Sequence, residues 1–167
     1  MKDAEDSVPS VNTAKYLDEK VNIETLVGKH ILTKDGQVIS VCRHFKAKKI
    51  LIYFFSAAWA PAIDVIARLK SLYVENLNRN TRMEIIFVSS DTDESTFNQY
   101  FAEQGPWCAI PFRSAICDEL RWMYGITCLP QIIVIRTDGT VITRKGKDEL
   151  ESLGNNVIVC WAEYIQQ

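Results

Sequence analysis

The chain has 167 residues, of which 47% are hydrophobic and 24% are charged, and its formal net charge is -2. This composition is typical of one globular domain, and it excludes a disordered, collagen-like or repeat protein. The near-neutral charge gives no general attraction to phosphate backbones or anionic membranes, so we expect neither nucleic acid nor membrane as a partner.

The first twenty residues and the cysteines bear on cellular location. Residues 1–20 mix both charges and lack the continuous apolar segment of a secretory signal peptide. The uncharged run at residues 50–63 contains Pro61 and is shorter than the roughly 20 apolar residues of a membrane-spanning helix. Five cysteines at irregular spacing are a poor disulfide framework. We therefore expect a soluble cytoplasmic protein with reduced thiols, which can also enter the nucleus.

The N-terminal part of the chain predicts a leader followed by a hairpin. Residues 1–24 lack a sustained hydrophobic period, so we expect an irregular leader there and a single domain over residues 25–167. Between His30 and Ser40, two short strand-like runs flank Lys34-Asp35-Gly36. An Asp-Gly pair tolerates the positive backbone angles that a tight hairpin turn requires.

Two pairs of a strand and a helix come next. Residues 50–55 are a continuous run of aliphatic and aromatic residues, typical of a central strand covered on both faces. Pro61 predicts the start of a helix of about four turns, since its missing amide hydrogen needs no partner there. Residues 83–89 repeat the pattern of a buried strand. We assign the carboxylates within residues 91–94 to capping of the following helix, rather than to cation binding.

The C-terminal part predicts a helix, a third core strand and a final helical region. Ser114 is placed to cap the helix and Gly125 to end it. A strand at residues 131–136 turns at Asp138-Gly139 into a second strand, and helix resumes near Lys147. Strands that alternate with helices and close with a hairpin predict an α/β fold whose mixed sheet is covered by helices on both faces.

The order of these elements, with the segment FFSAAWAPAI at residues 54–63, resembles the thioredoxin superfamily. Further segments resemble its tryparedoxin and nucleoredoxin branch, and most of all the nucleoredoxin-like proteins. They are IFVSSD (86–91), FNQYF (97–101), PWCAIPF (106–112), YGITCLP (124–130) and DGTVIT (138–143). The resemblance runs from Leu26 to Trp161 and implies a thioredoxin-like fold. It also implies a role in maintaining sensory and photoreceptor neurons, with which nucleoredoxin-like proteins are associated.

Active members of this family carry Trp-Cys, two residues and a second Cys at the first junction of strand and helix. The matching positions here are Trp59, Ala60 and Ile63. The first cysteine needs a helix N-terminus to stabilise its thiolate, and the second resolves the mixed disulfide. The methyl group of Ala60 and the branched hydrocarbon side chain of Ile63 can neither form a thiolate nor resolve a mixed disulfide. We therefore expect no dithiol oxidoreductase activity, no catalytic residue and no cofactor at this junction.

What remains at the junction is a string of side chains without an ionisable group. The resemblance implies that Leu129-Pro130 faces this string, with a cis peptide bond that lets a partner's extended backbone pair alongside. We call this apolar surface the mouth and define it as Trp59, Ala60, Pro61, Ala62, Ile63, Leu129 and Pro130. An exposed apolar patch marks a contact, so we interpret the mouth as a binding surface for a protein or an extended peptide. Packing beneath the leader and homodimerisation are the alternatives.

A competing function is a thiol enzyme or redox sensor that uses Cys128 or Cys108. Cys128 lies two positions before Pro130, but strand alternation predicts that its side chain points away from the mouth and is buried. His30 and His44 are distant in sequence from these thiols, and metal ligands usually recur at short intervals. The sequence therefore predicts no metal site.

Overall fold

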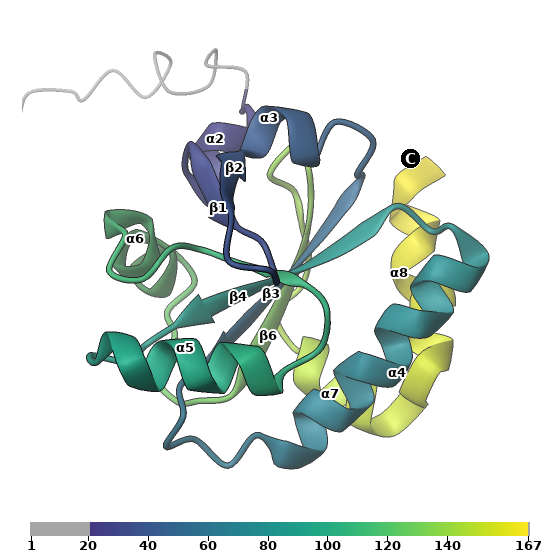
Figure 1. The fold of residues 1–167 in the computed structure, drawn as a ribbon. Helices are drawn as coiled ribbons and strands as arrows, with labels where there is room; N and C mark the ends of the chain where they lie inside the picture. Colours follow the sequence, from purple (N-terminus) through teal and green to yellow (C-terminus); the bar gives the residue numbers. More distant parts are fainter. Residues whose placement is uncertain (1–20, 167) are drawn as a thin grey trace, which may run out of the picture.

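A seven-stranded mixed sheet forms the centre of the structure, a computed structural model that describes residues 21–166 (Figure 1). The strands are β1 (His30–Leu32), β2 (Val38–Ser40), β3 (Ile50–Ser56), β4 (Met83–Ser89), β5 (Cys108–Ala109), β6 (Gln131–Arg136) and β7 (Val141–Thr143). They lie in the order β2-β1-β5-β4-β3-β6-β7. β3, β4 and β5 are parallel, and the other neighbours pair antiparallel.

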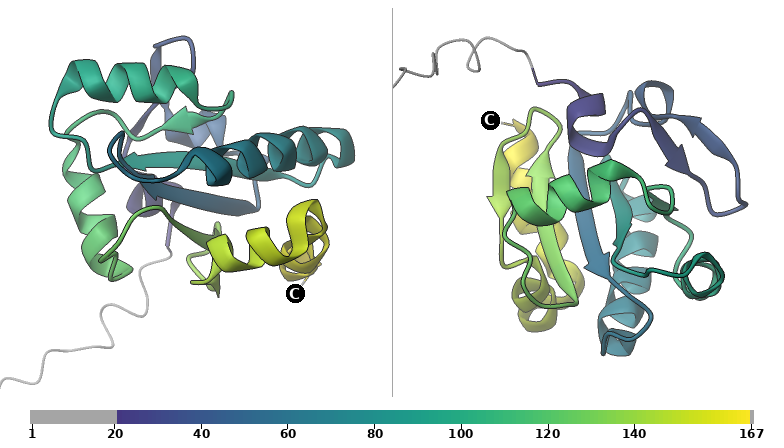
Figure 2. Two further views of the ribbon diagram at one scale, coloured as in Figure 1. Left: turned by 90° about the horizontal axis from the view of Figure 1, so that it is seen from below. Right: turned by 90° about the vertical axis from the view of Figure 1, so that its left-hand side faces the viewer.

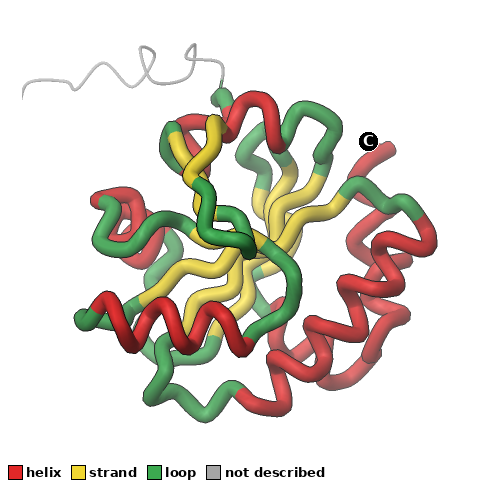
Figure 3. The backbone as a smooth tube through the Cα atoms, viewed as in Figure 1, coloured by secondary structure: helices red, strands yellow, loops and turns green. Residues whose placement is uncertain are grey.

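Helices cover both faces of this sheet, and Figure 3 shows them surrounding the central strands. They are α2 (Ile23–Val27), α3 (Val41–His44), α4 (Ile63–Arg79), α5 (Glu94–Glu103), α6 (Ala115–Met123), α7 (Gly146–Leu153) and α8 (Val157–Ala162), with short 3-10 segments at Gly154–Asn156 and Glu163–Gln166. The core under α4, α5, α7 and α8 is separate from the core under α2, α3 and α6. The predicted fold class is confirmed. Among residues 21–166, no helix combines the length and the hydrophobicity needed to cross a bilayer.

The two central strands carry the alternating pattern that divides the core. All seven residues of β3 and all seven of β4 are buried. Successive side chains of a strand point to opposite faces, so Phe54 packs in the core under α4 while Tyr53 and Phe55 pack in the core under α6. Burying one such large apolar side chain stabilises the fold by roughly 1.5–3 kcal/mol. The prediction of a central strand covered on both faces is confirmed.

Two hairpins were expected from Asp-Gly pairs, and both are present. β1 and β2 pair antiparallel with His30 opposite Ser40, and Gly36 has the positive φ of 87° that this turn requires. Figure 2 shows this hairpin at one edge of the molecule. The second turn joins β6 to β7, with Gly139 at a φ of 92° and its amide bonded to the carbonyl of Arg136.

Helix α4 begins two residues later than predicted. The sequence favoured a start at Pro61, whereas the helix starts at Ile63 and runs for 17 residues. The amide of Ala60 donates to the carbonyl of Ala57, and the amide of Ala62 donates to the carbonyl of Ala60. These bonds close a turn between β3 and α4, and the first helical bond therefore runs from Ile66 to Ala62.

Three short elements were not predicted, namely α2, α3 and β5. Each has five residues or fewer, which is too short to show a hydrophobic period. The prediction of an irregular leader over residues 1–24 lies outside the described residues up to residue 20. At its end it is wrong, because α2 begins at Ile23, with the side chain of Asn22 accepting a hydrogen bond from the amide of Thr25.

Candidate binding site at the start of α4

The mouth lies where β3 ends and α4 begins, and two of its side chains project into solvent. Trp59 is 71% exposed and Ile63 is 84% exposed, whereas Ala62 is buried against the core under α4. β3 ends at Ser56 and the buried run continues to Ala57, so Trp59 sits on the turn that follows the strand. The turn thus presents two large apolar groups to solvent, and none of residues 57–63 carries sulfur or a charge.

The turn is anchored to the end of β4 by a carboxylate. Oδ1 of Asp91 accepts a hydrogen bond of 3.0 Å from the amide of Ala58, and Oδ2 accepts one of 3.0 Å from the hydroxyl of Ser89. The prediction that Asp91 caps α5 is therefore wrong. The cap is Asp93, whose carboxylate accepts from the amide of Thr96 at 2.9 Å, and this hydrogen bond lowers the pKa of Asp93.

The second part of the mouth reaches the same end of the sheet from β6. Gln131, the first residue of β6, pairs with Phe55 near the end of β3. Pro130 therefore lies beside the strand end from which the mouth turn leaves. Pro130 is buried, Leu129 is half-buried against the core under α6, and the peptide bond between them is cis.

A hollow of about 390 Å³ runs between the start of α4 and the side of α5. Four mouth residues line it, namely Ala60, Pro61, Ala62 and Ile63. From α5 it receives the polar side chains of Thr96, Gln99, Tyr100 and Glu103. Burial raises the pKa of Tyr100, so its hydroxyl is neutral at physiological pH and bonds that of Ser56 at 2.8 Å. An apolar floor beside polar groups is suited to an extended peptide, which needs both.

Cys128 is exposed, which contradicts the prediction that it is buried. β6 begins only at Gln131, so Cys128 belongs to the preceding loop and the alternation of a strand does not apply to it. Its Sγ accepts a hydrogen bond of 2.9 Å from Nε2 of Gln131. The exposed thiol is therefore two residues from Pro130, in the loop that contributes to the mouth.

Cys108 has the opposite environment, because it is fully enclosed on β5. Burial raises the pKa of the Cys108 thiol well above its usual range, and burial likewise raises the pKa of Cys117 to about 11. Both thiols are thus protonated at neutral pH. Neither the mouth nor the hollow beside it is lined by Cys108 or Cys117.

Comparison with known proteins agrees with this architecture. The thioredoxin-like family model matches residues 47–141, which is more than half of the chain. Nucleoredoxin from Danio rerio is 38% identical over 99 residues, which make up 58% of this chain and 23% of the relative. Nucleoredoxin-like protein 1 from Homo sapiens is 25% identical over 129 residues, or 74% of this chain and 61% of the relative. The chain spans less than two thirds of the length of either relative.

Solved structures give the same result. Thioredoxin related protein 16 from Carcinoscorpius rotundicauda, described with a role in regulating transcription factor NF-kB activity, superposes with a TM-score of 0.71 and 34% identity. The match covers 82% of this chain and 97% of that chain. Tryparedoxin I from Crithidia fasciculata superposes with a TM-score of 0.66 and 25% identity over 84% of this chain and 91% of that chain. The chain therefore belongs to the thioredoxin-like family, and its domain is nucleoredoxin-like.

Proposed function

We propose that this domain is a non-catalytic binding or regulatory module whose mouth holds an extended segment of a partner protein. The observation that carries the proposal is the exposure of Trp59 and Ile63, 71% and 84%, on the turn where the family's redox motif is expected. Tryptophan is enriched among the residues that dominate protein interfaces. Covering a side chain such as Ile63 removes apolar area from water and contributes roughly 1.5–3 kcal/mol.

The absence of dithiol chemistry in this proposal follows from the side chains of the turn. Ala60 and Ile63 offer only hydrocarbon, so no thiolate forms at this end of α4 and no mixed disulfide is made or resolved there. Sulfur chemistry would have to come from another part of the chain. The hollow along α5 remains, and it supplies hydrogen-bonding groups for the backbone of a bound segment.

A capture experiment with paired variants tests the proposal. Natural protein, Ile63→Asp and Leu77→Asp are used as bait for the same extract, and prey are identified by mass spectrometry. Leu77 is 60% exposed on the same helix, roughly 21 Å along its axis from Ile63 at about 1.5 Å per residue. We expect Ile63→Asp to lose a specific prey that Leu77→Asp retains. Equal recovery with both variants contradicts binding at the mouth.

A second copy of the chain is the alternative occupant of the mouth. A self-complementary apolar patch can pair about a twofold axis. Light scattering over a concentration series measures the molar mass. A mass that doubles with concentration, and that Ile63→Asp returns to the monomer value, assigns the mouth to a dimer instead of a different partner.

The competing function is thiol chemistry at Cys128, which the exposure of that thiol in the loop before Pro130 favours. Reduction of insulin or of a small disulfide, coupled to a thioredoxin-type electron donor, measures this activity. For a binding module we expect no turnover above background. Turnover that Cys128→Ser abolishes and Cys160→Ser leaves intact assigns the domain to redox chemistry and overturns the non-catalytic proposal.

The cellular role is proposed from relatives alone. The likeness to nucleoredoxin-like proteins supports a place in the maintenance of sensory and photoreceptor neurons, in the cytoplasm and also in the nucleus. The role of the Carcinoscorpius rotundicauda protein in regulating transcription factor NF-kB activity agrees with a regulatory rather than a metabolic function. Localisation of the tagged natural chain in such cells tests this part, and an extracellular or membrane-bound location contradicts it.

A further inference from the structure

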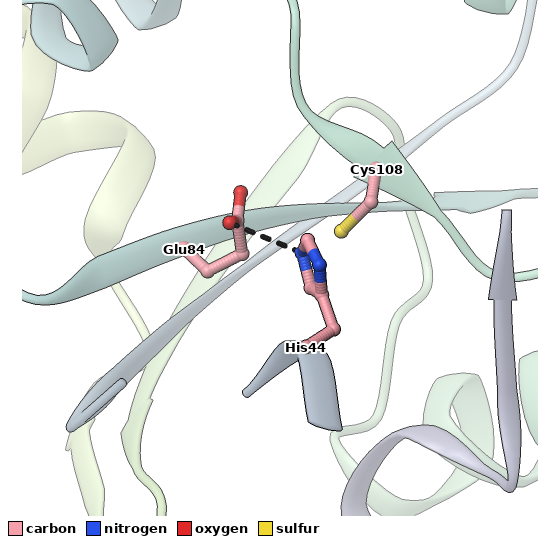
Figure 4. A group of neighbouring side chains, drawn as sticks. All are labelled: His44, Glu84 and Cys108. Carbon is pink, nitrogen blue, oxygen red and sulfur yellow. Dashed lines mark ion pairs between the residues drawn. The ribbon is translucent and has the colours of Figure 1, made fainter. Parts of the chain in front are cut away.

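Three side chains that are far apart in the sequence meet beside β4 and β5 (Figure 4). They are His44 at the end of α3, Glu84 on β4 and Cys108 on β5. One nitrogen, one oxygen and one sulfur from these residues all lie within 4.8 Å of one another. In Figure 4 the imidazole stands between the carboxylate and the thiol, and Nε2 of His44 is 3.4 Å from Oε2 of Glu84.

The environment of the cluster is unusual for groups of this polarity. Glu84 is only 3% exposed and Cys108 is only 3% exposed. Nε2 of His44 is buried and, among the described residues, makes no hydrogen bond of acceptable geometry. Its 3.4 Å contact with Oε2 of Glu84 is an ion pair only when the imidazole is protonated, whereas a neutral imidazole can offer the lone pair of this nitrogen to a cation. The imidazole therefore lies beside a carboxylate oxygen and a thiol, which are two further ligand types.

We propose that His44, Glu84 and Cys108 form a binding site for a divalent d10 metal ion such as Zn²⁺. Imidazole nitrogen, carboxylate oxygen and thiolate sulfur are the three ligand types that zinc takes in proteins. Ligand bonds of about 2.0–2.3 Å at tetrahedral angles place donor atoms roughly 3.5 Å apart. The three atoms lie within 4.8 Å of one another, so small rotations of the side chains reach this spacing.

The fourth coordination position opens towards a small cavity of about 70 Å³, which the same three residues line together with Tyr73 and Lys34. A metal site with three protein ligands keeps this position for water or an exogenous ligand. Tyr73 lines the same cavity, where its hydroxyl can donate a hydrogen bond to that water.

The charge of the site is balanced in both states. Without metal, Nζ of Lys48 lies 3.7 Å from Oε2 of Glu84 and compensates the carboxylate, and the Cys108 thiol keeps its proton. On binding, the Sγ–H bond breaks, Sγ bonds to the metal and the proton passes to water. The thiolate and carboxylate together neutralise the two positive charges of the ion, so Lys48 is free to turn to solvent, where it is already partly exposed.

Cobalt and zinc titrations of the reduced protein test the site. The parent protein carries Cys42→Ser, Cys128→Ser and Cys160→Ser, which remove the exposed thiols. We expect one Co²⁺ per chain with a thiolate-to-cobalt charge-transfer band, displaced by one Zn²⁺, and a rise in Tm with ZnCl2. A parent that gives no charge-transfer band and no zinc-dependent shift in Tm overturns the proposal without any further variant.

Two ligand variants and a matched control locate the metal. In the same parent, Cys108→Ser and His44→Gln are each expected to weaken Zn²⁺ binding by more than the 10–100-fold typical of supporting residues around a metal, and Cys108→Ser to abolish the charge-transfer band. Cys117→Ser changes the other buried thiol and is expected to leave affinity and spectrum unchanged. His44 is partly exposed, so its variant remains informative if Cys108→Ser fails to fold. Retention of affinity in His44→Gln contradicts the site.

Discussion

The amide of Ala58 donates a hydrogen bond of 3.0 Å to the carboxylate of Asp91, across 33 positions of the sequence. The same carboxylate also accepts from Ser89, so a single side chain joins the turn after β3 to the end of β4. Trp59 follows Ala58 directly and has little packing of its own, being 71% exposed. A polar anchor just beyond β4 therefore helps to orient the mouth, together with the buried Ala57 and Ala62 at the two ends of the turn.

Replacing Asp91 with alanine is expected to loosen the mouth while the fold persists. The loss of hydrogen bonds to a charged acceptor in solvent costs about 1 kcal/mol of unfolding free energy. Amide hydrogen exchange at Ala58, measured by NMR, is expected to accelerate. Asp138→Ala is the control, because Asp138 accepts from the amide of Thr140 at 2.9 Å in the distant turn between β6 and β7. Equal exchange at Ala58 in both variants contradicts the anchoring role.

Restoring sulfur to the turn is expected to restore a reducible disulfide. In Ala60→Cys with Ile63→Cys, the two thiols stand three positions apart around the start of α4, where helix amides favour a thiolate. Thiol titration before and after reduction counts the bond, and each single variant serves as control. A double variant that keeps two free thiols under mild oxidation shows that the turn is not shaped for the family's chemistry.

The long elements were predictable because burial leaves a strong pattern in the sequence. β3 and β4 have continuous apolar runs, and the Asp-Gly pairs mark both hairpins where glycine takes a positive φ. The start of α4 was placed two residues early, since the backbone bonds between Ala57 and Ala62 leave no trace in residue type. Local pattern thus predicts elements well and their junctions less well.

Only those features of the candidate site that depend on residue type could be predicted from the sequence. The sequence shows directly that Ala60 and Ile63 carry no sulfur, whereas the anchoring by Asp91 depends on a parallel pairing of β3 with β4. Cys128 was misplaced because strand alternation was extended into a loop. His44 and Cys108 are 64 positions apart in the sequence, and only the order of the strands in the sheet brings them together, so the sequence could not predict their contact.

The five thiols are expected to divide into two groups in a reaction with a disulfide reagent at pH 8. Cys42, Cys128 and Cys160 are exposed and react in the native protein, whereas Cys108 and Cys117 react only on unfolding. Within the first group Cys42 is expected to be slow, because the hydrogen bond to Glu24 at 3.5 Å raises the pKa of its thiol. The Glu24→Gln variant is expected to speed the reaction of Cys42 with the reagent. Five fast thiols in the native state contradict the buried positions.

Cys117 is expected to make the protein sensitive to alkaline pH. Burial raises the pKa of its thiol from an ordinary value near 9 to about 11 in the folded chain. A group whose pKa is raised by folding contributes its stability fully below the unfolded pKa and loses it as pH rises through the folded pKa. The advantage in Tm of natural protein over Cys117→Ala should therefore be constant up to pH 9 and shrink between pH 9 and pH 11.

Thermal unfolding followed by circular dichroism between pH 7 and pH 11 measures this difference in Tm. Cys160→Ala, at an exposed position, is the control and should show no such trend. If the difference in Tm between natural protein and Cys117→Ala is unchanged at pH 11, folding does not raise the pKa of the Cys117 thiol, and the prediction is contradicted.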